Sequence, residues 1–590
     1  MNWSRDILLS EIPSWVELLK SEMADADVRR QLLERIQGIQ MDFNEGEQES
    51  SNLEQIVVRD CARSLQGILR PASERRSDFS FLKALRDVAR GTPRPDLSAA
   101  FFAEVTHLFR GLERRTGLYE SAPPSHKLEG REAALKRSEK LDELWRRTEA
   151  TMSRYPHGLL PEIIEKRKKN RIRILQALSA SDENWSSWQW QFRHVARTAE
   201  QLEALVPLSA DERECIHLAT SHHIPFGVTP FYASLMDAEP DSSADRAVRA
   251  QVIPPLHYLD EMIAHREDRE YAFDFMLERD TSPIDLITRR YTTIVILKPY
   301  DTCPQICVYC QRNWEIQQPL RPEALATREA LETAIQWIRE HPAIHEVLVT
   351  GGDPLALSDR RILSLLERLS DIDHVERIRI GTRLPVTCPM RITPELVSIL
   401  ARFQSPGRRE ICVVTHVEHP YEINQDLVAA IHRLRLAGIS VYNQLVFTSY
   451  VSRRFEAALL RRLLRLCLID PYYTFTTKGK EETRDYRVPL ARILQEQKEE
   501  ARLLPGLART DEAVYNVPGL GKNYLRAWQH RDLVAILPDG ARLYEFHPWE
   551  KKILPQKSYL GADIPILDYL ERLREIGEDP AAYESIWHYY

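Results

Sequence analysis

The 590-residue sequence has no run of about 18 apolar residues, so it predicts no transmembrane helix. Its first residues, "MNWSRDILLSEIPSW", lack the basic head and the apolar core of a signal peptide. The formal net charge of −7 is small for this length and indicates no nucleic-acid partner. Cysteine is scarce, and the eight residues are spread too unevenly for a disulfide framework. We therefore expect a soluble cytoplasmic protein with no membrane partner.

A chain of this length exceeds what one hydrophobic core organises, so about two to four domains are expected. Residues 1–180 are predicted to be helical, because apolar residues recur at helical spacing in "FLKALRDVAR" and "FFAEVTHLFRGLERR". Further on, Ser209 and Glu212 are placed as a capping box. The basic run "EKRKKNRIRI" (165–174) is interpreted as a solvated helix face, with a docking surface for RNA or an acidic partner as the alternative.

Beyond residue 290, short apolar strands alternate with amphipathic helices. The alternation predicts a parallel sheet built of βα units, either open or closed into a barrel. Ligands of such sheets bind at the carboxyl ends of the strands. The expected strands are 292–299, 346–350, 376–382, 410–416 and 440–448. After residue 500, "VYNVPGLGKNY" is interpreted as a loop, and "DLVAILPDGARLYEF" as a hairpin that turns at Asp539-Gly540.

Three cysteines, Cys303, Cys307 and Cys310, fall within eight residues directly after the first of these strands. Structural zinc needs four protein ligands, and the nearest further candidates, His341 and His345, lie across a predicted helix. A [4Fe–4S] cluster held by three cysteines keeps one iron open for a substrate or cofactor. The spacing therefore favours an iron–sulfur cluster over zinc.

The motif Cys303-x₃-Cys307-x₂-Cys310, with Tyr309 before its last cysteine, resembles the radical S-adenosylmethionine (SAM) signature. "GGDP", which follows the second strand, resembles the element of that superfamily that contacts the methionyl amino group of SAM. The residues that would bind SAM are Gly351, Gly352 and Asp353.

A series of segments between residues 185 and 548 resembles the lysine 2,3-aminomutase family, most closely a glutamate 2,3-aminomutase. In order, they are "WSSWQWQFRHVARTAEQLEALVPLS", "GVTPFYASLMD", "RIRIGTRLPVTCPMRITPELV", "THVEHPYEI" and "YNQLVF". The resemblance implies an incomplete parallel (β/α) barrel of radical SAM type with a helical N-terminal extension. Four segments are expected: the extension (1–180), a helical family-specific segment (181–288), the partial barrel (289–500), and a C-terminal lysine loop, hairpin and tail (501–590).

The resemblance also implies pyridoxal 5′-phosphate (PLP) as a cofactor beside the cluster and SAM. In "VPGLGKN" it makes Lys522 the Schiff-base residue, with Gly519 and Gly521 giving the backbone its freedom. Arg290 and Tyr291 resemble positions that contact PLP. For these two, a strand-start ion pair and a packed ring are the alternative.

Substrate choice is read from three positions that the resemblance identifies. Arg312, two residues after the last cysteine of the motif, would pair with the α-carboxylate of a free amino acid. Lys478 and Asn516 stand where the lysine enzymes carry two aspartates that hold the distal ammonium group. A cation and an amide would repel a lysine side chain and bind a distal carboxylate, as in glutamate. The alternative for "TKGKEETRD" is a charged solvated loop.

The expected activity is that of an isomerase, an intramolecular aminotransferase that moves the α-amino group of a free L-amino acid, L-glutamate, to Cβ. Lysine, aspartate or arginine are alternative substrates, and a radical enzyme that modifies a macromolecule or a purely structural cluster are alternative functions. An external electron donor such as flavodoxin or ferredoxin is implied. A homo-oligomer is also expected, without the zinc site of the lysine enzymes, because no cysteine follows Cys467.

Overall fold

The computed structural model describes residues 3–45, 52–118, 128–239, 242–477, 480–527, 530–548 and 558–590. Contacts between residues group the chain into two compact units, and neither is one continuous stretch of sequence. The terminal unit comprises residues 1–150, 488–503 and 522–590, and the central unit comprises residues 151–487 and 504–521. The four consecutive segments expected from the sequence stay a prediction.

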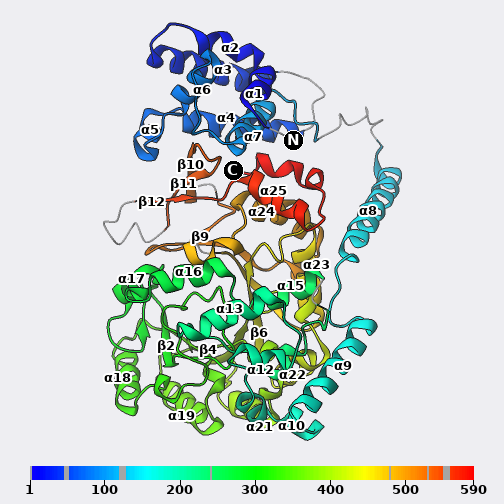
Figure 1. The fold of residues 1–590 in the computed structure, drawn as a ribbon, viewed down its shortest axis with the longest axis vertical. Coiled ribbons are helices and arrows are strands. Elements are labelled where there is room, and N and C mark those ends of the chain that lie inside the picture. Colours follow the sequence, from blue (N-terminus) through cyan, green and yellow to red (C-terminus); the bar gives the residue numbers. More distant parts are fainter. Residues whose placement is uncertain are drawn as a thin grey trace. The chain divides into compact units, whose positions relative to one another are not determined.

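A mainly parallel sheet runs through the central unit (Figure 1). β1 is antiparallel to β2, whereas each strand from β2 to β7 pairs in parallel with the next one, ending with the pair of β7 and β8. The strands are β1 (Ile287–Thr288), β2 (Ile294–Tyr300), β3 (Glu346–Gly351), β4 (Arg377–Gly381), β5 (Glu410–Thr415), β6 (Ser440–Phe447), β7 (Asp470–Thr476) and β8 (Glu512–Val517). Val295, Val347 and Ile378 are aligned on adjacent strands and buried, as expected where helices cover a parallel sheet. The predicted α/β fold with a parallel sheet is confirmed, and its closure into an incomplete barrel stays a prediction.

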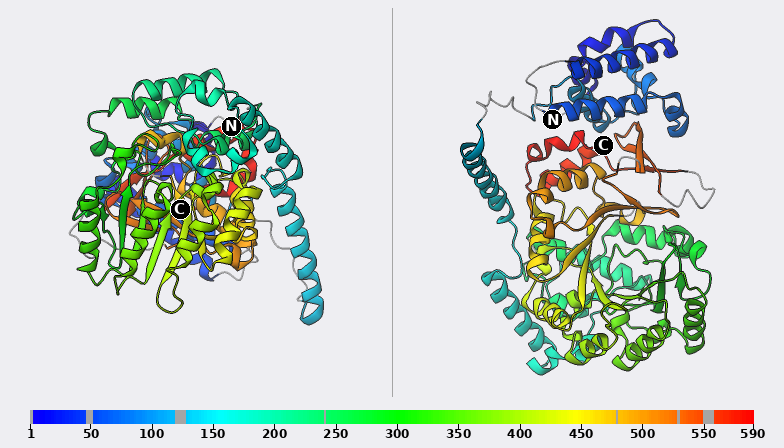
Figure 2. Two further views of the ribbon diagram at one scale, coloured as in Figure 1. Left: turned by 90° about the horizontal axis from the view of Figure 1, so that it is seen from below. Right: turned by 180° about the vertical axis from the view of Figure 1, so that it is seen from behind.

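Helices alternate with these strands, also as predicted, and Figure 2 shows them around the sheet from two further directions. α19 contacts α21, and α21 contacts α22, so these helices lie side by side. Several begin with a side-chain cap: Thr327, Thr393 and Asn424 each accept a hydrogen bond from a backbone N–H in the first turn. The helices are α18 (Arg328–Arg339), α19 (Asp359–Ser370), α20 (Leu384–Thr387), α21 (Pro394–Ala401), α22 (Gln425–Leu436) and α23 (Glu456–Leu466).

Short helices before the sheet complete the central unit. They are α9 (Pro161–Ala177), α10 (Asp182–Ser186), α11 (Trp188–Arg193), α12 (Ala199–Glu203), α13 (Ala210–Ser221), α14 (Pro230–Ala233), α15 (Ser243–Arg249), α16 (Leu256–Ala264) and α17 (Arg269–Phe273). The capping box of Ser209 is confirmed at the start of α13. The basic run falls on α9, where Lys168 is solvated but Arg167 is buried and donates to the carbonyl of Tyr421. The interpretation of this run as a solvated helix face is therefore wrong for Arg167, whose side chain is packed inside this unit.

The terminal unit combines N-terminal helices with the end of the chain. Its helices are α1 (Arg5–Glu11), α2 (Pro13–Lys20), α3 (Asp25–Glu45), α4 (Asn52–Ile68), α5 (Pro71–Ser77), α6 (Phe81–Arg90), α7 (Ala99–Leu112), α24 (Leu490–Gln495) and α25 (Ile566–Glu575). α8 (Gly130–Met152) ends just past the boundary between the units. A small antiparallel sheet consists of β10 (Arg531–Ile536), β11 (Arg542–Phe546) and β12 (Tyr559–Ala562). β10 and β11 are the predicted hairpin, which is confirmed.

One hydrophobic core joins the two ends of the chain in this unit. Trp15 and Phe101 of the N-terminal helices are fully buried in the same cluster as Ile536 and Tyr590. The buried Arg542 pairs with Glu104 at 3.0 Å and donates to backbone carbonyls near the C-terminus. The first helices and the last residues therefore fold together.

The loop interpretation of "VYNVPGLGKNY" is wrong in part. β8 extends to Val517, a turn follows in which Gly519 has φ +64°, and β9 (Gly521–Tyr524) begins at Gly521. β8 forms because its residues pair with β7, a long-range contact that the proline and glycines of this segment conceal in the sequence. The boundary between the units falls within β9.

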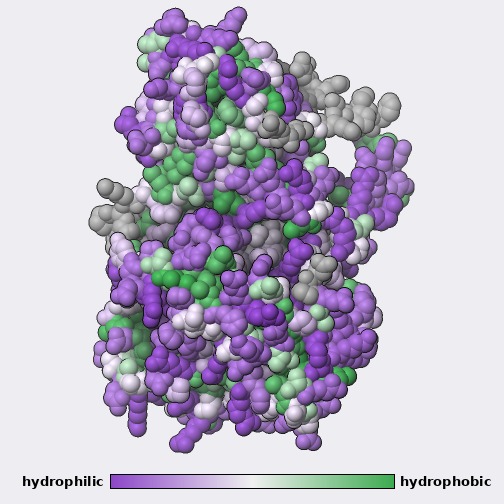
Figure 3. All heavy atoms as spheres, in the orientation of Figure 1, coloured by the Kyte–Doolittle hydropathy of each residue, from purple (hydrophilic) through white to green (hydrophobic). Residues whose placement is uncertain are grey.

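Among the described residues, no helix is both long and apolar enough to cross a membrane. The face drawn in Figure 3 is mainly hydrophilic, with small hydrophobic patches.

Candidate active site

The three cysteines of the motif lie on one loop, the cysteine loop (residues 301–316), which begins directly after β2. Cys303, Cys307 and Cys310 are free thiols that are partly shielded from solvent. The loop is fastened to the rest of the unit, for example by a backbone hydrogen bond from Val308 to the carbonyl of Gln251 at 2.9 Å. The thiols therefore occupy the carboxyl end of a parallel strand, where such sheets bind ligands.

The glycine pair after β3 lies against the cysteine loop. A Cβ atom on Gly352 would collide with the backbone of Thr302, so only glycine fits there. Gly351 has φ +105°, a conformation that side chains other than glycine rarely adopt. The backbone N–H of Asp353 donates to the carbonyl of Thr302 at 3.0 Å. The structure thus brings together the two motifs that the sequence places on successive strands.

The carboxylate of Asp353 joins the end of β3 to the segment after β4. It accepts hydrogen bonds from the hydroxyl of Thr382 at 2.7 and 2.9 Å and from the backbone N–H of Arg383 at 2.9 Å. The side chain is buried, and these bonds hold the glycine pair in place beside the cysteines.

Arg383 is a site residue that sequence reasoning missed. Its Nη1 donates to the Sγ of Cys307 at 2.9 Å, and its Nη2 pairs with the buried carboxylate of Glu422 at 2.6 Å. The same Nη2 also donates to the side chain of Gln251. The only available signal was its place just after a predicted strand, in "IGTR".

Burial raises the pKa of all three thiols, and at Cys303 the carboxylate of Asp353 adds to the effect. At Cys307 the positive charge of Arg383 opposes it. Among the described residues, no three His, Cys, Asp or Glu side chains converge as the ligands of a single metal ion do. A [4Fe–4S] cluster binds each thiolate at a different iron, so three separate thiols on one loop fit such a cluster.

Arg312 is buried on the same loop and already has two carboxylate partners. Its Nη1 lies 2.7 Å from a carboxylate oxygen of Glu278 and 2.9 Å from one of Glu315. Glu315 also pairs with Lys298. Burial alone would lower the pKa of Arg312, but the two carboxylates outweigh it and raise the pKa. The guanidinium is therefore charged and firmly held.

A second buried ion pair lies next to this arginine. Lys480 is 2.6 Å from both the carboxylate of Glu482 and the side-chain oxygen of Asn313, the residue after Arg312. Sequence reasoning missed this group. Lys478, the residue expected to face a distal carboxylate, lies outside the described residues.

The residues expected to bind PLP are Arg290, Tyr291 and Lys522. Arg290 donates to the carbonyl of Gly519 at 2.9 Å, which joins the start of the sheet to the glycine turn that precedes Lys522. Arg290 thus bonds to backbone oxygen here, and Tyr291 beside it is half-buried. Asn516 is half-buried near the end of β8. Lys522 is half-buried in β9 and belongs to the terminal unit.

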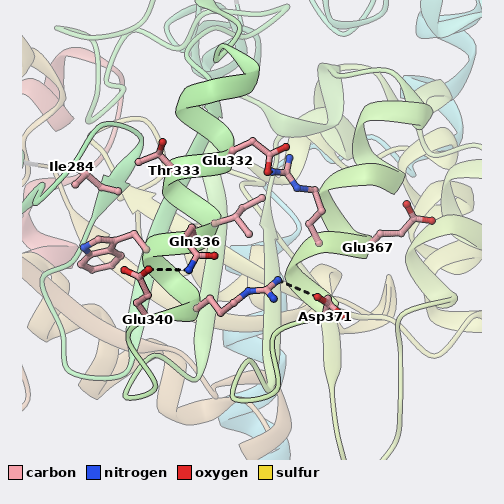
Figure 4. Close-up of a pocket in the computed structure, with 11 residues that line it drawn as sticks. Ile284, Glu332, Thr333, Gln336, Glu340, Glu367 and Asp371 are labelled. Carbon is pink, nitrogen blue, oxygen red and sulfur yellow. Dashed lines mark hydrogen bonds and ion pairs between the residues drawn. The ribbon is translucent and has the colours of Figure 1, made fainter.

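A surface pocket of about 820 Å³ lies between α18 and α19, and Figure 4 shows its lining. Its polar side chains satisfy one another: Gln336 bonds to Glu340 at 2.8 Å, and Arg339 pairs with Asp371 at 3.0 Å. None of its lining residues belongs to the cysteine loop or the glycine pair. The site described above therefore does not coincide with this pocket.

Comparison with known proteins supports the interpretation of the cysteine loop as the ligand loop of an iron–sulfur cluster. The model of the radical SAM superfamily matches residues 297–451. An uncharacterized KamA family protein of Methanocaldococcus jannaschii is 43% identical over an alignment of 606 positions, gaps included. The alignment covers 99% of this chain and 97% of that protein. The glutamate 2,3-aminomutase of Clostridioides difficile is 28% identical and covers 71% of this chain and 92% of its own length. The L-lysine 2,3-aminomutase of Acetoanaerobium sticklandii is 32% identical and covers 53% and 72%, respectively.

The radical SAM family implies an enzyme with a [4Fe–4S] cluster and SAM, and the cysteine loop offers the ligands for that cluster. The alignment with the M. jannaschii protein takes in 99% of this chain, whereas that with the lysine enzyme takes in 53%. The chain belongs to the KamA family of radical SAM proteins.

Proposed function

We propose that this protein is a PLP- and SAM-dependent radical 2,3-aminomutase that moves the α-amino group of L-glutamate to Cβ. The observation that carries the proposal is the position of Arg312. This buried, charged guanidinium stands two residues after Cys310 on the same loop. A planar guanidinium is the preferred partner of a carboxylate, so a free amino acid would be held beside the cluster by its α-carboxylate.

The other side chains have separate tasks in this proposal. Cys303, Cys307 and Cys310 would hold the cluster, and the glycine pair would receive the methionyl end of SAM. Arg290 and the glycine turn would support PLP, with Lys522 as its covalent attachment. When bound, the cluster and SAM supply the radical, and PLP carries the amino group during its migration. The chain's own contribution is to orient these groups and to exclude water.

Two observations support glutamate as the substrate. Lys478 and Asn516 replace the acidic pair that a distal ammonium would need. The relative that acts on glutamate also aligns with a larger share of this chain than the lysine enzyme does. A distal carboxylate would gain an ion pair with Lys478, whereas a lysine side chain would meet like charge.

A second candidate is the same reaction on L-lysine, and one observation favours it. The buried carboxylate of Glu482 has one oxygen, Oε2, without a hydrogen-bond partner among the described residues. A buried acceptor in this state can take a further N–H donor beside Lys480, such as the ammonium group of L-lysine, and Glu482 bonds to Asn313, the neighbour of Arg312. Aspartate and arginine are further substrates to include in a test.

The proposal includes a cytoplasmic location, an external electron donor such as flavodoxin or ferredoxin, and a homo-oligomer. It is tested by an anaerobic assay with reconstituted cluster, PLP, SAM and dithionite. Each amino acid is offered separately, and its β-amino product is measured. Turnover of glutamate alone supports the proposed reaction and its substrate. Turnover of lysine alone moves the assignment to the second candidate, and cleavage of SAM without any amino-acid product contradicts both.

A further inference from the structure

The short segment Met276–Glu278, which we call the clamp segment, contacts both halves of the candidate site. At one end, Glu278 pairs with Arg312 of the cysteine loop at 2.7 Å. Its other carboxylate oxygen accepts a hydrogen bond from Gln311 at 3.3 Å. Glu278 is buried, so this ion pair and this hydrogen bond lie away from bulk water. One carboxylate therefore holds two consecutive side chains that follow the last cluster cysteine.

The other end of the clamp segment contacts the glycine turn before Lys522. The carbonyl of Met276 accepts a hydrogen bond from Arg290, which also donates to the carbonyl of Gly519. A Cβ atom on Gly519 would lie 3.0 Å from the side chain of Leu277. The turn is thus packed directly against the residue that precedes Glu278.

The backbone of the clamp segment is held in an unusual conformation. Leu277 has φ +51°, which costs free energy in a residue other than glycine and persists only when the surroundings enforce it. Asp274 supplies that enforcement, because its carboxylate accepts the backbone N–H groups of Glu278 at 2.9 Å and Arg279 at 3.3 Å. The side chain of Glu278 is therefore aimed by a fixed backbone.

The ion pairs that Arg312 forms with described residues involve one of its three nitrogens, Nη1. Both Glu278 and Glu315 contact Nη1, and no hydrogen bond from Nε or Nη2 to another described residue is found. A carboxylate binds a guanidinium most strongly through two parallel N–H bonds. With Nη1 occupied from one side, the Nε–Nη2 edge is the one that remains for such a bidentate partner.

We propose that Glu278 is a positioning residue for the substrate. It anchors Nη1 of Arg312 so that the Nε–Nη2 edge meets the α-carboxylate of the amino acid, and the clamp segment sets that edge in register with the glycine turn before Lys522. This inference rests on the proposed aminomutase function. It assigns a role to a residue that neither binds the cluster nor contacts the substrate.

The test compares Glu278→Gln, Glu278→Asp and the matched control Asp280→Asn in the reconstituted holoenzyme. Asp280 lies two residues away and is exposed, and its ion-pair partner among the described residues is Arg279 at 3.8 Å. We expect Glu278→Gln to raise KM for the amino acid roughly tenfold or more, with a smaller change in kcat. Glu278→Asp should recover part of the loss, and Asp280→Asn should match the wild type.

Two further readouts separate positioning from a general structural role. Equilibrium dialysis with labelled L-glutamate, and with L-lysine if that is the substrate, should show the same loss of affinity without turnover. Iron content and SAM cleavage without amino acid should stay at the wild-type level. In an Arg312→Lys background, Glu278→Gln should add about threefold or less, because its effect acts through the guanidinium.

An unchanged KM and an unchanged binding constant in Glu278→Gln would overturn the inference, as would an undiminished effect in the Arg312→Lys background. Equal loss of iron and of amino-acid binding would also overturn it, because a collapsed site rather than a displaced arginine would be the cause. Failure of the wild type to bind or convert any of the amino acids would instead refute the proposed function itself.

Discussion

Nη1 of Arg383 donates a hydrogen bond to the Sγ of Cys307 over 2.9 Å. The two residues follow different strands, β4 and β2, and the contact places a positive charge, on a side chain that is 10% exposed, against one of the expected cluster ligands. Hydrogen bonds and charges at the ligand sulfurs set the reduction potential of an iron–sulfur cluster. Arg383 should therefore make the cluster easier to reduce.

Replacing Arg383 by glutamine should lower the midpoint potential of the cluster. Loss of a charged hydrogen bond worth about 1.4 kcal/mol corresponds to a shift of roughly 60 mV for a one-electron couple. Redox titration followed by electron paramagnetic resonance measures the shift, with Arg360→Gln at an exposed position as the control. A potential equal to that of the wild type would show that the hydrogen bond has no electronic effect.

Gly352→Ala should disrupt the cysteine loop. Its new Cβ would meet the backbone of Thr302, and the backbone cannot move aside as a flexible side chain can. Overpacking of this kind costs about 1–3 kcal/mol, so we expect lower stability and reduced iron content after reconstitution. Gly506→Ala is the matched control, because nothing lies within 4 Å of the added atom. Full iron incorporation in Gly352→Ala would contradict the close packing described here.

Acid should weaken the terminal unit through His588. Burial, with a contribution from Arg542, lowers the pKa of this imidazole to about 3. In the unfolded chain the pKa of this imidazole is about 6.5. Between about pH 6.5 and pH 3 the unfolded state therefore binds a proton at this residue and the folded state does not, so acid favours unfolding. His588 by itself should lower the free energy of unfolding by about 1.4 kcal/mol between pH 7.5 and pH 5.5.

Urea titrations at the two pH values test this expectation, with hydrogen exchange assigning the transition to the terminal unit. His588→Gln should flatten the pH dependence, although the neighbouring His107, whose pKa is also lowered by burial, keeps part of it. His217→Gln, at an exposed position of the central unit, should leave the dependence unchanged. Equal stability of the wild type at both pH values would mean that His588 is hydrated in solution.

Substrate preference should respond to Lys478 and Asn516. Changing both to aspartate restores the acidic pair of the lysine enzymes, so turnover of lysine relative to glutamate should rise about tenfold or more. The ratio of kcat/KM values for the two amino acids measures the change. The control Lys498→Asp makes the same change from lysine to aspartate at a position in the terminal unit, and it should leave that ratio unchanged. A double variant with an unaltered ratio would place specificity elsewhere, with Glu482 as the next residue to change.

The elements of the site that are local in sequence could be predicted. The spacing of Cys303, Cys307 and Cys310 can be recognised in the sequence without knowledge of the fold. The predicted alternation of strands and helices is enough to place Gly352 beside the cysteine loop. Contacts made over long sequence distances could not be predicted. Glu278, Arg383 and Lys480 belong to the site only because the sheet brings separate segments together, and each alone resembles an ordinary surface charge.

The difference between local and long-range contacts also explains why the prediction for the segment around Gly519 is only partly right. Its proline and glycines are correctly interpreted as turn residues, but β8, the strand before the turn, depends on β7, a partner far away in the chain. The buried position of Arg167 also depends on a distant partner, the carbonyl of Tyr421.

The chain passes between the two units after residues 150, 487, 503 and 521, so neither unit can be excised as one continuous polypeptide. A fragment that begins at residue 151 would keep Ile536 and Tyr590 but lose the helices that cover them, and its tail would expose apolar surface that invites aggregation. The N-terminal region is accordingly not a separable appendage, because its helices and the last residues of the chain complete one core.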